Sequence, residues 1–291
     1  SACGPGDLID SAREVFPQAV EILPDFIEAW VGSEDVERVE VEPTPKSLTK
    51  QAPIEPDSAD SEEEISQSED PVLGRDIVLN EKTIVRESDD PPYAVQIRYP
   101  YLEGDSEAIP PFNSEVEALV EVVLETFLSD VAEREAARAE GAMQAVSTLD
   151  IDHQVTYQED GLISVYLPMT TYLAISAHPS NVSFSYNYDI INQTFLLPRD
   201  LFREEADYFP ALLSFVEEDL ASRGFDYQTS SAEAVLVRRD NWNILPEGLR
   251  INFDAYEVGP GAAGPQQVLI PWDVLIDNLD LEGPAGRIQL Y

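Results

Sequence analysis

Few residues in this chain could carry chemistry. Its 291 residues include two histidines, His153 and His178. Asp150 and Asp152 precede His153, but alternation along a strand would place the two carboxylates on one face and the imidazole on the other. A metal ion needs several ligands that converge on one point. We therefore expect no metal site and no bound cofactor.

Enzymatic motifs are also missing from the sequence. It contains no Gly-x-Ser-x-Gly elbow and no phosphate-binding P-loop. A carboxylate pair for glycoside hydrolysis could arise anywhere in a chain with 57 acidic residues, so such a pair would indicate little by itself. We expect a protein that is not an enzyme. A hydrolase that uses paired carboxylates is the alternative.

Binding residues are expected in one loop and one strand. The segment from Tyr256 to Pro265 contains two turns that pair proline with glycine, which predict a stiff projection suited to binding. His178 ends a strand, and a structural role beside Asn187 or Asp189 is favoured over catalysis. The candidate binding residues are therefore Tyr256, Glu257, Gly259, Pro260, Gly261, Gly264, Pro265, His178, Asn187 and Asp189.

An aromatic strand gives a second possibility for binding. Phe184, Tyr186 and Tyr188 alternate and so share one face. If that face is exposed, it could bind a sugar or a protein partner, but burial in the core is the default expectation.

The first residues read Ser1-Ala2-Cys3-Gly4. They resemble the end of a bacterial lipoprotein signal, in which a cysteine after small residues becomes lipidated. The resemblance implies that Cys3 anchors the chain to the membrane on the periplasmic or cell-surface side. The alternative is an ordinary exposed cysteine. Because Cys3 is the single cysteine, an intramolecular disulfide is excluded.

The chain divides into three parts by composition. Residues 1–32 combine the anchor cysteine with short apolar pieces of helical spacing, which prolines interrupt. Residues 33–72 are rich in proline and acidic residues and predict a disordered, extended linker. Residues 73–291 alternate apolar and polar positions and predict a folded module, with a first half at 73–160 and a second half at 161–291.

The module pattern predicts helices segregated from antiparallel strands. Strands are expected near residues 77–85 and 94–99, as a meander over 150–197, and in two segments after residue 248. A capping box at Ser114 and Glu117 predicts a helix that runs to about Val146, and a second helix is expected over 205–223. The fold class is therefore α+β, an antiparallel sheet with two main helices packed on it in two layers.

The charge narrows the choice of partner. The formal net charge is -40, and residues 71–291 alone hold 38 acidic and 13 basic residues. Nucleic acid is excluded as a partner because phosphate binding needs basic patches. The field would attract a cationic partner. Adaptation to a salty setting is the other explanation.

A family resemblance rests on short motifs in a fixed order: Tyr99-Pro100, Ala177-His178-Pro179, Asn187-Tyr188-Asp189, Leu201-Phe202, Tyr256-Glu257 and Ile270-Pro271-Trp272. This order resembles the extracytoplasmic domain-of-unknown-function module of the anti-sigma factor RsiV, a lysozyme sensor, and of some peptidoglycan deacetylases. The resemblance covers roughly residues 75–280. It implies an α+β module that acts by binding in the cell envelope. We expect a cationic, lysozyme-like protein or peptidoglycan as the partner. Besides a hydrolase, the alternative to a binding module is a structural envelope lipoprotein.

Overall fold

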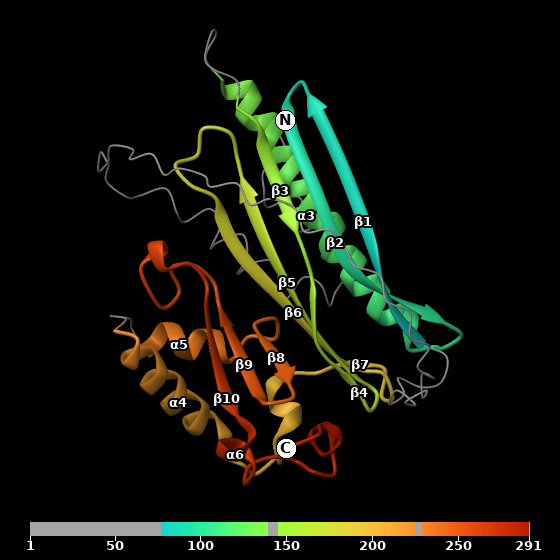
Figure 1. Cartoon of the computed structure of the whole chain (residues 1–291), viewed down its shortest axis with the longest axis vertical. Coiled ribbons are helices and arrows are strands. Elements are labelled where there is room, and N and C mark those ends of the chain that lie inside the picture. The colour runs from blue at the N-terminus through green and yellow to red at the C-terminus, as the bar shows by residue number, and fades with distance from the viewer. Residues whose placement is uncertain (1–76, 139–144, 225–228, 291) are drawn as a thin grey trace, which may run out of the picture.

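The computed structural model describes residues 77–138, 145–224 and 229–290. The predicted anchor segment and acidic linker lie outside the described residues. The described chain forms a larger and a smaller sheet, each with helices on one face (Figure 1). This arrangement confirms the predicted α+β class. Within the described residues, no helix is long and apolar enough to cross a membrane.

The larger sheet has seven strands in the order β1-β2-β3-β5-β6-β7, and β4 pairs with β5. The bounds are β1 (Ile77–Asp89), β2 (Pro92–Gly104), β3 (Ser147–Ile151), β4 (Gln154–Glu159), β5 (Leu162–Tyr172), β6 (Ser180–Asp189) and β7 (Thr194–Phe195). Strands β2 and β3 are parallel, and the other pairs are antiparallel. A parallel pair needs a crossover, which the long helix α3 (Ile109–Ala137) provides.

The predicted buried stripe of α3 is confirmed, but its predicted ends are wrong. The buried apolar residues are Ile109, Phe112, Val116, Val120, Val123, Leu124, Phe127 and Val131. The helix begins before the predicted capping box because Pro110 and Pro111 occupy its first turn, where proline fits a helix well. Glu117 accepts a hydrogen bond from Lys82 at 2.8 Å instead of capping the helix. Val146 lies beyond the helix, next to β3.

The meander over residues 150–197 is confirmed. Asp160 and Gly161 connect β4 to β5, with φ angles of 48° and 77°. Two successive positive φ angles are the requirement of a tight type I′ hairpin turn, and the Asp-Gly pair meets it at low cost. The aromatic residues Phe184, Tyr186 and Tyr188 are buried against α3, so they belong to the core.

The smaller sheet has three antiparallel strands in the order β10-β9-β8. They are β8 (Trp242–Leu245), β9 (Gly248–Phe253) and β10 (Gln266–Pro271), and helices α4 (Tyr208–Ser222), α5 (Thr229–Leu236) and α6 (Trp272–Leu275) accompany them. Helix α4 ends before Gly224, as predicted, and the φ of +78° there favours glycine. Helix α5 and strand β8 were not predicted.

Each sheet has its own apolar core. One core lies between α3 and the larger sheet, and the other lies between the smaller sheet and α4 and α5. The two cores approach each other at Leu162 and Ile163 of β5, whose neighbouring side chains point to opposite sides of the strand. The sheets therefore meet through the remaining face of β5 and β6, where the candidate site begins.

Candidate functional site

The surfaces through which the two sheets meet are polar. Ser164 of β5 and Ser185 and Asn187 of β6 point away from α3, toward Asn243 of β8 and Asn252 of β9. We call these five residues the polar seam. All five are at most 3% exposed. A buried polar group is costly unless it has hydrogen-bond partners, so the seam must satisfy its own donors and acceptors.

Asn243 is the centre of the polar seam. Its Nδ2 donates to Ser164 Oγ and to the carbonyl of Val165, both at 3.0 Å. Its Oδ1 accepts from Ser185 Oγ at 3.0 Å and from Asn252 Nδ2 at 2.8 Å. One side chain thus links strands of both sheets. Such a network of buried hydrogen bonds fixes their relative position.

Ser164 in the polar seam has no activating base. Its hydroxyl donates to Asn187 Oδ1 at 2.7 Å, and it accepts from Asn243 and from the backbone N–H of Ile244. A nucleophilic serine needs a neighbouring general base such as histidine. The amides around Ser164 cannot take its proton, so the arrangement serves to hold the sheets together.

An exposed pair of rings lies at one end of the smaller sheet, where the β5–β6 loop meets the predicted loop. His178 Nε2 lies 3.3 Å from Tyr256 Oη, and the ring centroids are 6.0 Å apart. Tyr256 is 60% exposed. The sequence interpretation that placed His178 beside Asn187 or Asp189 is wrong, because the β5–β6 loop carries it to the β9–β10 loop instead. The structure thus brings together two candidates that are 78 residues apart.

The loop backbone holds Tyr256 in place. Its φ angle is +74°, a value that residues with a side chain rarely adopt. The ring lies over Gly261, where an added Cβ would overlap it. Gly264, at φ +68°, ends the short 3-10 helix Gly261–Ala263, and Gln266 Nε2 donates to the carbonyls of Ala263 and Gly264. These contacts make the loop stiff.

Arg238, Asp240, Asp254 and Glu257 form an acid–arginine cluster that supports the loop. Arg238 binds Glu257 at 2.7 Å and Asp240 at 3.1 Å. Glu257 Oε2 accepts from the backbone N–H of Asp254 at 2.6 Å, and Asp254 Oδ1 accepts from Ser183 Oγ at 2.9 Å. Glu257, a predicted binding residue, therefore holds the turn that presents Tyr256.

Titration of the acid–arginine cluster is shifted toward neutral pH. Burial, reinforced by the nearby Glu257 carboxylate, raises the pKa of Asp254 to about 7. Burial also raises the pKa of Glu257, although Arg238 opposes that effect. One arginine, Arg238, and local hydrogen bonds hold the acidic side chains of the cluster in place. In the described parts of the chain, no group of histidine, cysteine and acidic side chains could bind a metal.

The other predicted candidates are placed apart from the loop. Asn187 lies in the polar seam, where its Nδ2 donates to the carbonyl of Trp242 at 2.7 Å. Asp189 is buried, and its Oδ1 accepts from the backbone N–H groups of Ile191 and Asn192 while Arg287 pairs with it. Both side chains therefore stabilise the fold. Gly259 and Pro260 lie in the loop, and Pro265 follows its last glycine.

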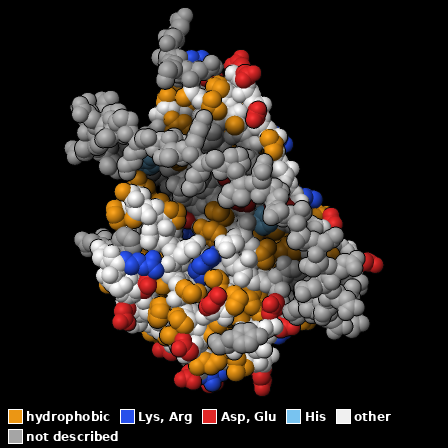
Figure 2. Space-filling view, in the orientation of Figure 1, with side chains coloured by type: hydrophobic (Ala, Val, Ile, Leu, Met, Phe, Trp, Pro, Cys, Tyr) orange, Lys and Arg blue, Asp and Glu red, His pale blue; other side chains and the backbone are white. Residues whose placement is uncertain are grey.

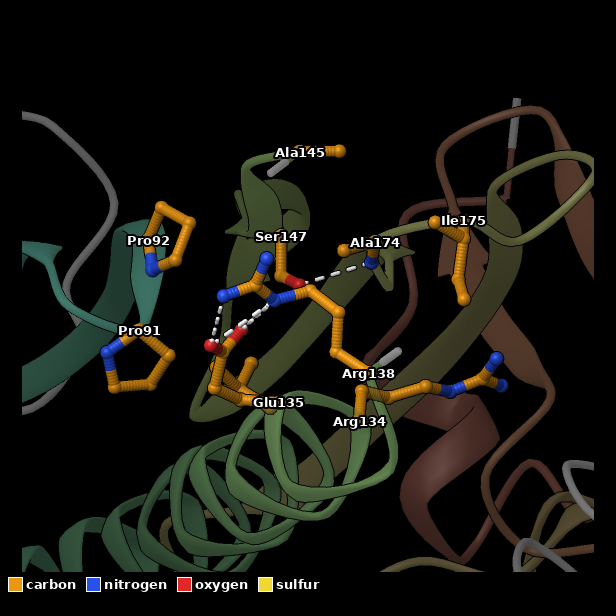
Figure 3. A pocket seen from close by; sticks show the side chains of 10 residues that line it. Pro91, Pro92, Arg134, Glu135, Arg138, Ala145, Ser147, Ala174 and Ile175 are labelled. Atoms are coloured by element: carbon orange, nitrogen blue, oxygen red, sulfur yellow. Dashed lines mark hydrogen bonds and ion pairs between the residues drawn. The ribbon is translucent and has the colours of Figure 1, made fainter. Parts of the chain in front are cut away.

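A small pocket lies at the end of the larger sheet where α3 ends and β3 begins. The side chains around it come from the end of α3, the β1–β2 turn and the β5–β6 loop, among them Pro91, Arg134 and Ile175 (Figure 3). Arg138 folds back onto Glu135, whereas Arg134 extends toward the side of Ile175. The cavity volume of about 20 Å³ has room for about one water molecule, so it does not suit a ligand.

The surface charge is uneven on the face drawn in Figure 2. Lysine and arginine side chains gather in two spots over the smaller-sheet part, while acidic side chains are most frequent toward its lower edge. The local charge at a site therefore differs from the net charge of -40 that the sequence gives.

The residues that join the sheets and support the loop were not predicted from the sequence. Serine and asparagine on alternate positions of a strand normally indicate a solvated face. The available signal was that these strands carry amides and hydroxyls at alternate positions, at 164, 185, 187, 243 and 252. Arg238, Asp240 and Asp254 gave no local signal, because their proximity depends on the packing of separate segments.

The fold and the paired sheets define a class of α+β module. Residues 199–273 match the family described as "Protein of unknown function (DUF3298)". A solved member of that family from Bacteroides fragilis has a TM-score of 0.54 and 16% identity, covering 73% of this chain and 97% of the other. A second, from Pseudomonas aeruginosa, has a TM-score of 0.50 and 16% identity, covering 72% and 97%. These likenesses concern the fold.

A particular relative is a peptidoglycan-N-acetylmuramic acid deacetylase, PdaC of Bacillus subtilis. It is 26% identical to this chain over 137 residues. The match covers 45% of this chain but 29% of the relative. The chain thus corresponds to less than a third of that enzyme's length.

Proposed function

We propose that this protein is a non-catalytic binding module of the bacterial cell envelope. The proposal rests on Tyr256. Its large aromatic side chain is 60% exposed beside His178, although its backbone is held at φ +74°. Strained backbone persists where the surrounding structure enforces it, and it clusters at functional sites. Tyrosine is also enriched at binding surfaces, because it offers contact area at low entropic cost.

The first candidate ligand is the glycan of the cell wall. An exposed tyrosine ring presents an apolar face with a hydroxyl at its edge, which suits stacking against a sugar ring. The relative PdaC, by its name, acts on a peptidoglycan sugar. A module shared with such an enzyme would serve it by holding the same polymer.

The second candidate ligand is a basic protein such as a lysozyme. The net charge of -40 favours it, since the field of the protein would steer a cationic partner inward. The resemblance to the RsiV module implies the same kind of partner. A sensor or inhibitor role would follow from that binding.

Attachment to the membrane is part of the proposal. Cys3, which lies outside the described residues, is the proposed lipid-modified residue on the periplasmic or cell-surface side. Labelled fatty acid should be incorporated into the natural protein but not into a Cys3→Ser variant. Equal labelling of the two proteins would contradict the anchor.

The competing proposal is an envelope hydrolase. Its two carboxylates would be Asp254 and Glu257, because both have raised pKa values and they are linked through the backbone of Asp254. Turnover of peptidoglycan that is lost in Asp254→Asn and Glu257→Gln variants with native stability would favour this alternative.

The ligand test compares purified insoluble peptidoglycan with immobilised basic lysozyme, at about 0.1 M and about 1 M salt. Screening shortens from roughly 10 Å to 3 Å over this range. We expect capture on peptidoglycan that survives high salt. Salt-resistant capture on lysozyme alone would favour the second candidate. Failure to bind either, or binding that disappears with salt, would contradict the proposal.

A further inference from the structure

Arg250 is a buried cation at the edge of the polar seam. It projects from β9 toward the larger sheet and is 7% exposed. Its Nη2 donates to Asn243 Oδ1 at 3.1 Å, and its Cζ lies 4.8 Å from the centre of the Tyr166 ring on β5. Both partners are neutral, so neither balances the charge of the guanidinium.

Among the residues that the structure describes, Arg250 differs from the arginines nearby because no carboxylate pairs with it. Arg238, Arg239 and Arg287 have side chains 26%, 26% and 23% exposed, and each pairs with a carboxylate. Arg250 is more deeply buried, yet it forms no ion pair with any described carboxylate, and burial lowers its pKa. An unbalanced buried charge is strongly unfavourable, and in a chain with 57 acidic residues a counter-ion would be easy to supply.

Two hydrogen-bonding atoms near this charge are also unsatisfied. Arg250 Nε and Asn252 Oδ1 are buried and have no hydrogen-bond partner in the described part of the chain. They belong to alternate residues of β9, so their side chains leave the strand on the same face. One is a donor on a cation and the other is an acceptor. A ligand that completes the site must bring an anion and an N–H group close to it.

We propose that Arg250 and Asn252 form a subsite for a carboxylate that lies next to an amide N–H, as at the C-terminal end of a peptide. The guanidinium binds carboxylate oxygens in a planar, two-pronged geometry. Asn252 Oδ1 accepts from the neighbouring amide. A singly charged carboxylate fits better than a phosphate dianion, because one positive charge must balance it in an acidic protein. The subsite goes beyond the proposed function and does not use Tyr256.

Tyr166 covers the subsite in the structure. Its ring stacks on the guanidinium and is itself only partly buried. Entry of a ligand requires this ring to turn aside, after which the ring can pack against the ligand. If the guanidinium turns from Asn243 to the ligand, Asn243 Oδ1 keeps the hydrogen bonds that it accepts from Ser185 and Asn252.

The direct test is a titration of the whole protein, labelled with ¹⁵N, with N-acetylalanine. The observed signal is the Nε–H resonance of Arg250, assigned by its absence in Arg250→Met. We expect this resonance to shift. The methyl ester of N-acetylalanine, which has no charge, should bind at least about 10-fold more weakly, as expected for loss of a charge-assisted hydrogen bond. Acetate should also bind more weakly, because it has no N–H for Asn252.

A stability measurement separates a binding role from a structural one. Arg250→Met should melt at the same temperature as the natural protein or higher, since removing an unbalanced buried charge is neutral or stabilising. Arg86→Met, at an exposed site on β1, is the matched control. N-acetylalanine should raise the melting temperature of the natural protein and of Tyr256→Ala but not of Arg250→Met.

Three results would overturn the subsite. One is an unchanged Arg250 Nε resonance at about 10 mM N-acetylalanine, where even millimolar binding is visible. Another is binding of inorganic phosphate as strong as that of N-acetylalanine. The third is an Arg250→Met variant that melts well below the Arg86→Met control, which would make Arg250 a structural residue.

Discussion

At the scale of single residues, the loop that carries Tyr256 depends on space as well as on hydrogen bonds. The ring rests on Gly261, and this contact fixes the direction of the phenol. Gly261→Ala should displace the ring and weaken ligand binding about 10-fold, with a change in unfolding free energy below about 1 kcal/mol, because the loop is on the surface. The measurement is ligand affinity together with denaturant unfolding.

Ala262→Ser is the control for this substitution. Ala262 lies in the same short helix and is exposed, so an added oxygen meets only solvent. It should leave both affinity and stability unchanged. If Gly261→Ala binds as tightly as Ala262→Ser, the position of the Tyr256 ring does not matter for binding.

Asp254 should make stability depend on pH. Its pKa is about 7 in the folded state and 3.8 ordinarily, so between these values the folded state holds a proton that the unfolded state has lost. The contribution of Asp254 to stability therefore falls as pH rises through this window and is lowest above pH 7. Between pH 5 and pH 8 the loss should be about 1–3 kcal/mol.

Asp254→Asn removes this titration while keeping an acceptor for Ser183. The variant should be about as stable as the natural protein near pH 4 and more stable at pH 8. Unfolding in urea at several pH values measures the difference, and general charge repulsion cancels between the two proteins. Parallel pH profiles would show that Asp254 has an ordinary pKa.

At the scale of helices and strands, the polar seam holds the two sheets together. Asn243→Ala removes one hydrogen-bond partner each from Ser164, Ser185 and Asn252, and unsatisfied buried groups are more costly than the bonds themselves. We expect a loss of about 2–4 kcal/mol in the free energy of unfolding. Chemical denaturation followed by tryptophan fluorescence would report it through Trp242, which is buried beside the seam.

Asn80→Ala is the matched control for the polar seam. Asn80 is exposed on β1 and makes one surface hydrogen bond, to Glu103 at 2.8 Å. Its loss should change stability by less than about 0.5 kcal/mol. If the two asparagine variants were equally stable, the polar seam would not be what couples the sheets.

The elements predicted correctly from the sequence are those whose signal lies in neighbouring residues. The apolar stripe of α3 and the turn at Asp160-Gly161 are of this kind, since periodicity and turn chemistry reside in neighbouring residues. Local signals failed where a competing one was stronger, as when Pro110 and Pro111 started α3 before the capping box. They also failed for α5, which is only eight residues long.

The candidate site was predictable in part. The loop around Tyr256 was found from its glycines and prolines, which constrain the backbone wherever they occur. Its partner His178 was placed wrongly, because their contact depends on how the two sheets pack. The burial of Arg250 could not be predicted either, since a strand sequence does not show which face meets water and which meets another sheet.

At the scale of the whole molecule, the two sheets form the base from which the β9–β10 loop presents the proposed binding surface. The large negative charge affects association more than fold. Association with a basic protein should therefore slow steeply as salt rises, while association with a neutral glycan should change little. Stopped-flow or surface-based rates at two salt concentrations separate the two. Equal salt dependence would mean that charge does not select the partner.

Tyr256 and its stiff loop form the proposed binding surface. The most direct measurement is co-sedimentation of the natural protein, Tyr256→Phe and Tyr256→Ala with insoluble peptidoglycan. We predict that the phenylalanine variant, which keeps the ring, retains most of the binding, and that the alanine variant binds at least about 10-fold more weakly at unchanged stability. Equal binding by Tyr256→Ala and the natural protein would contradict the account.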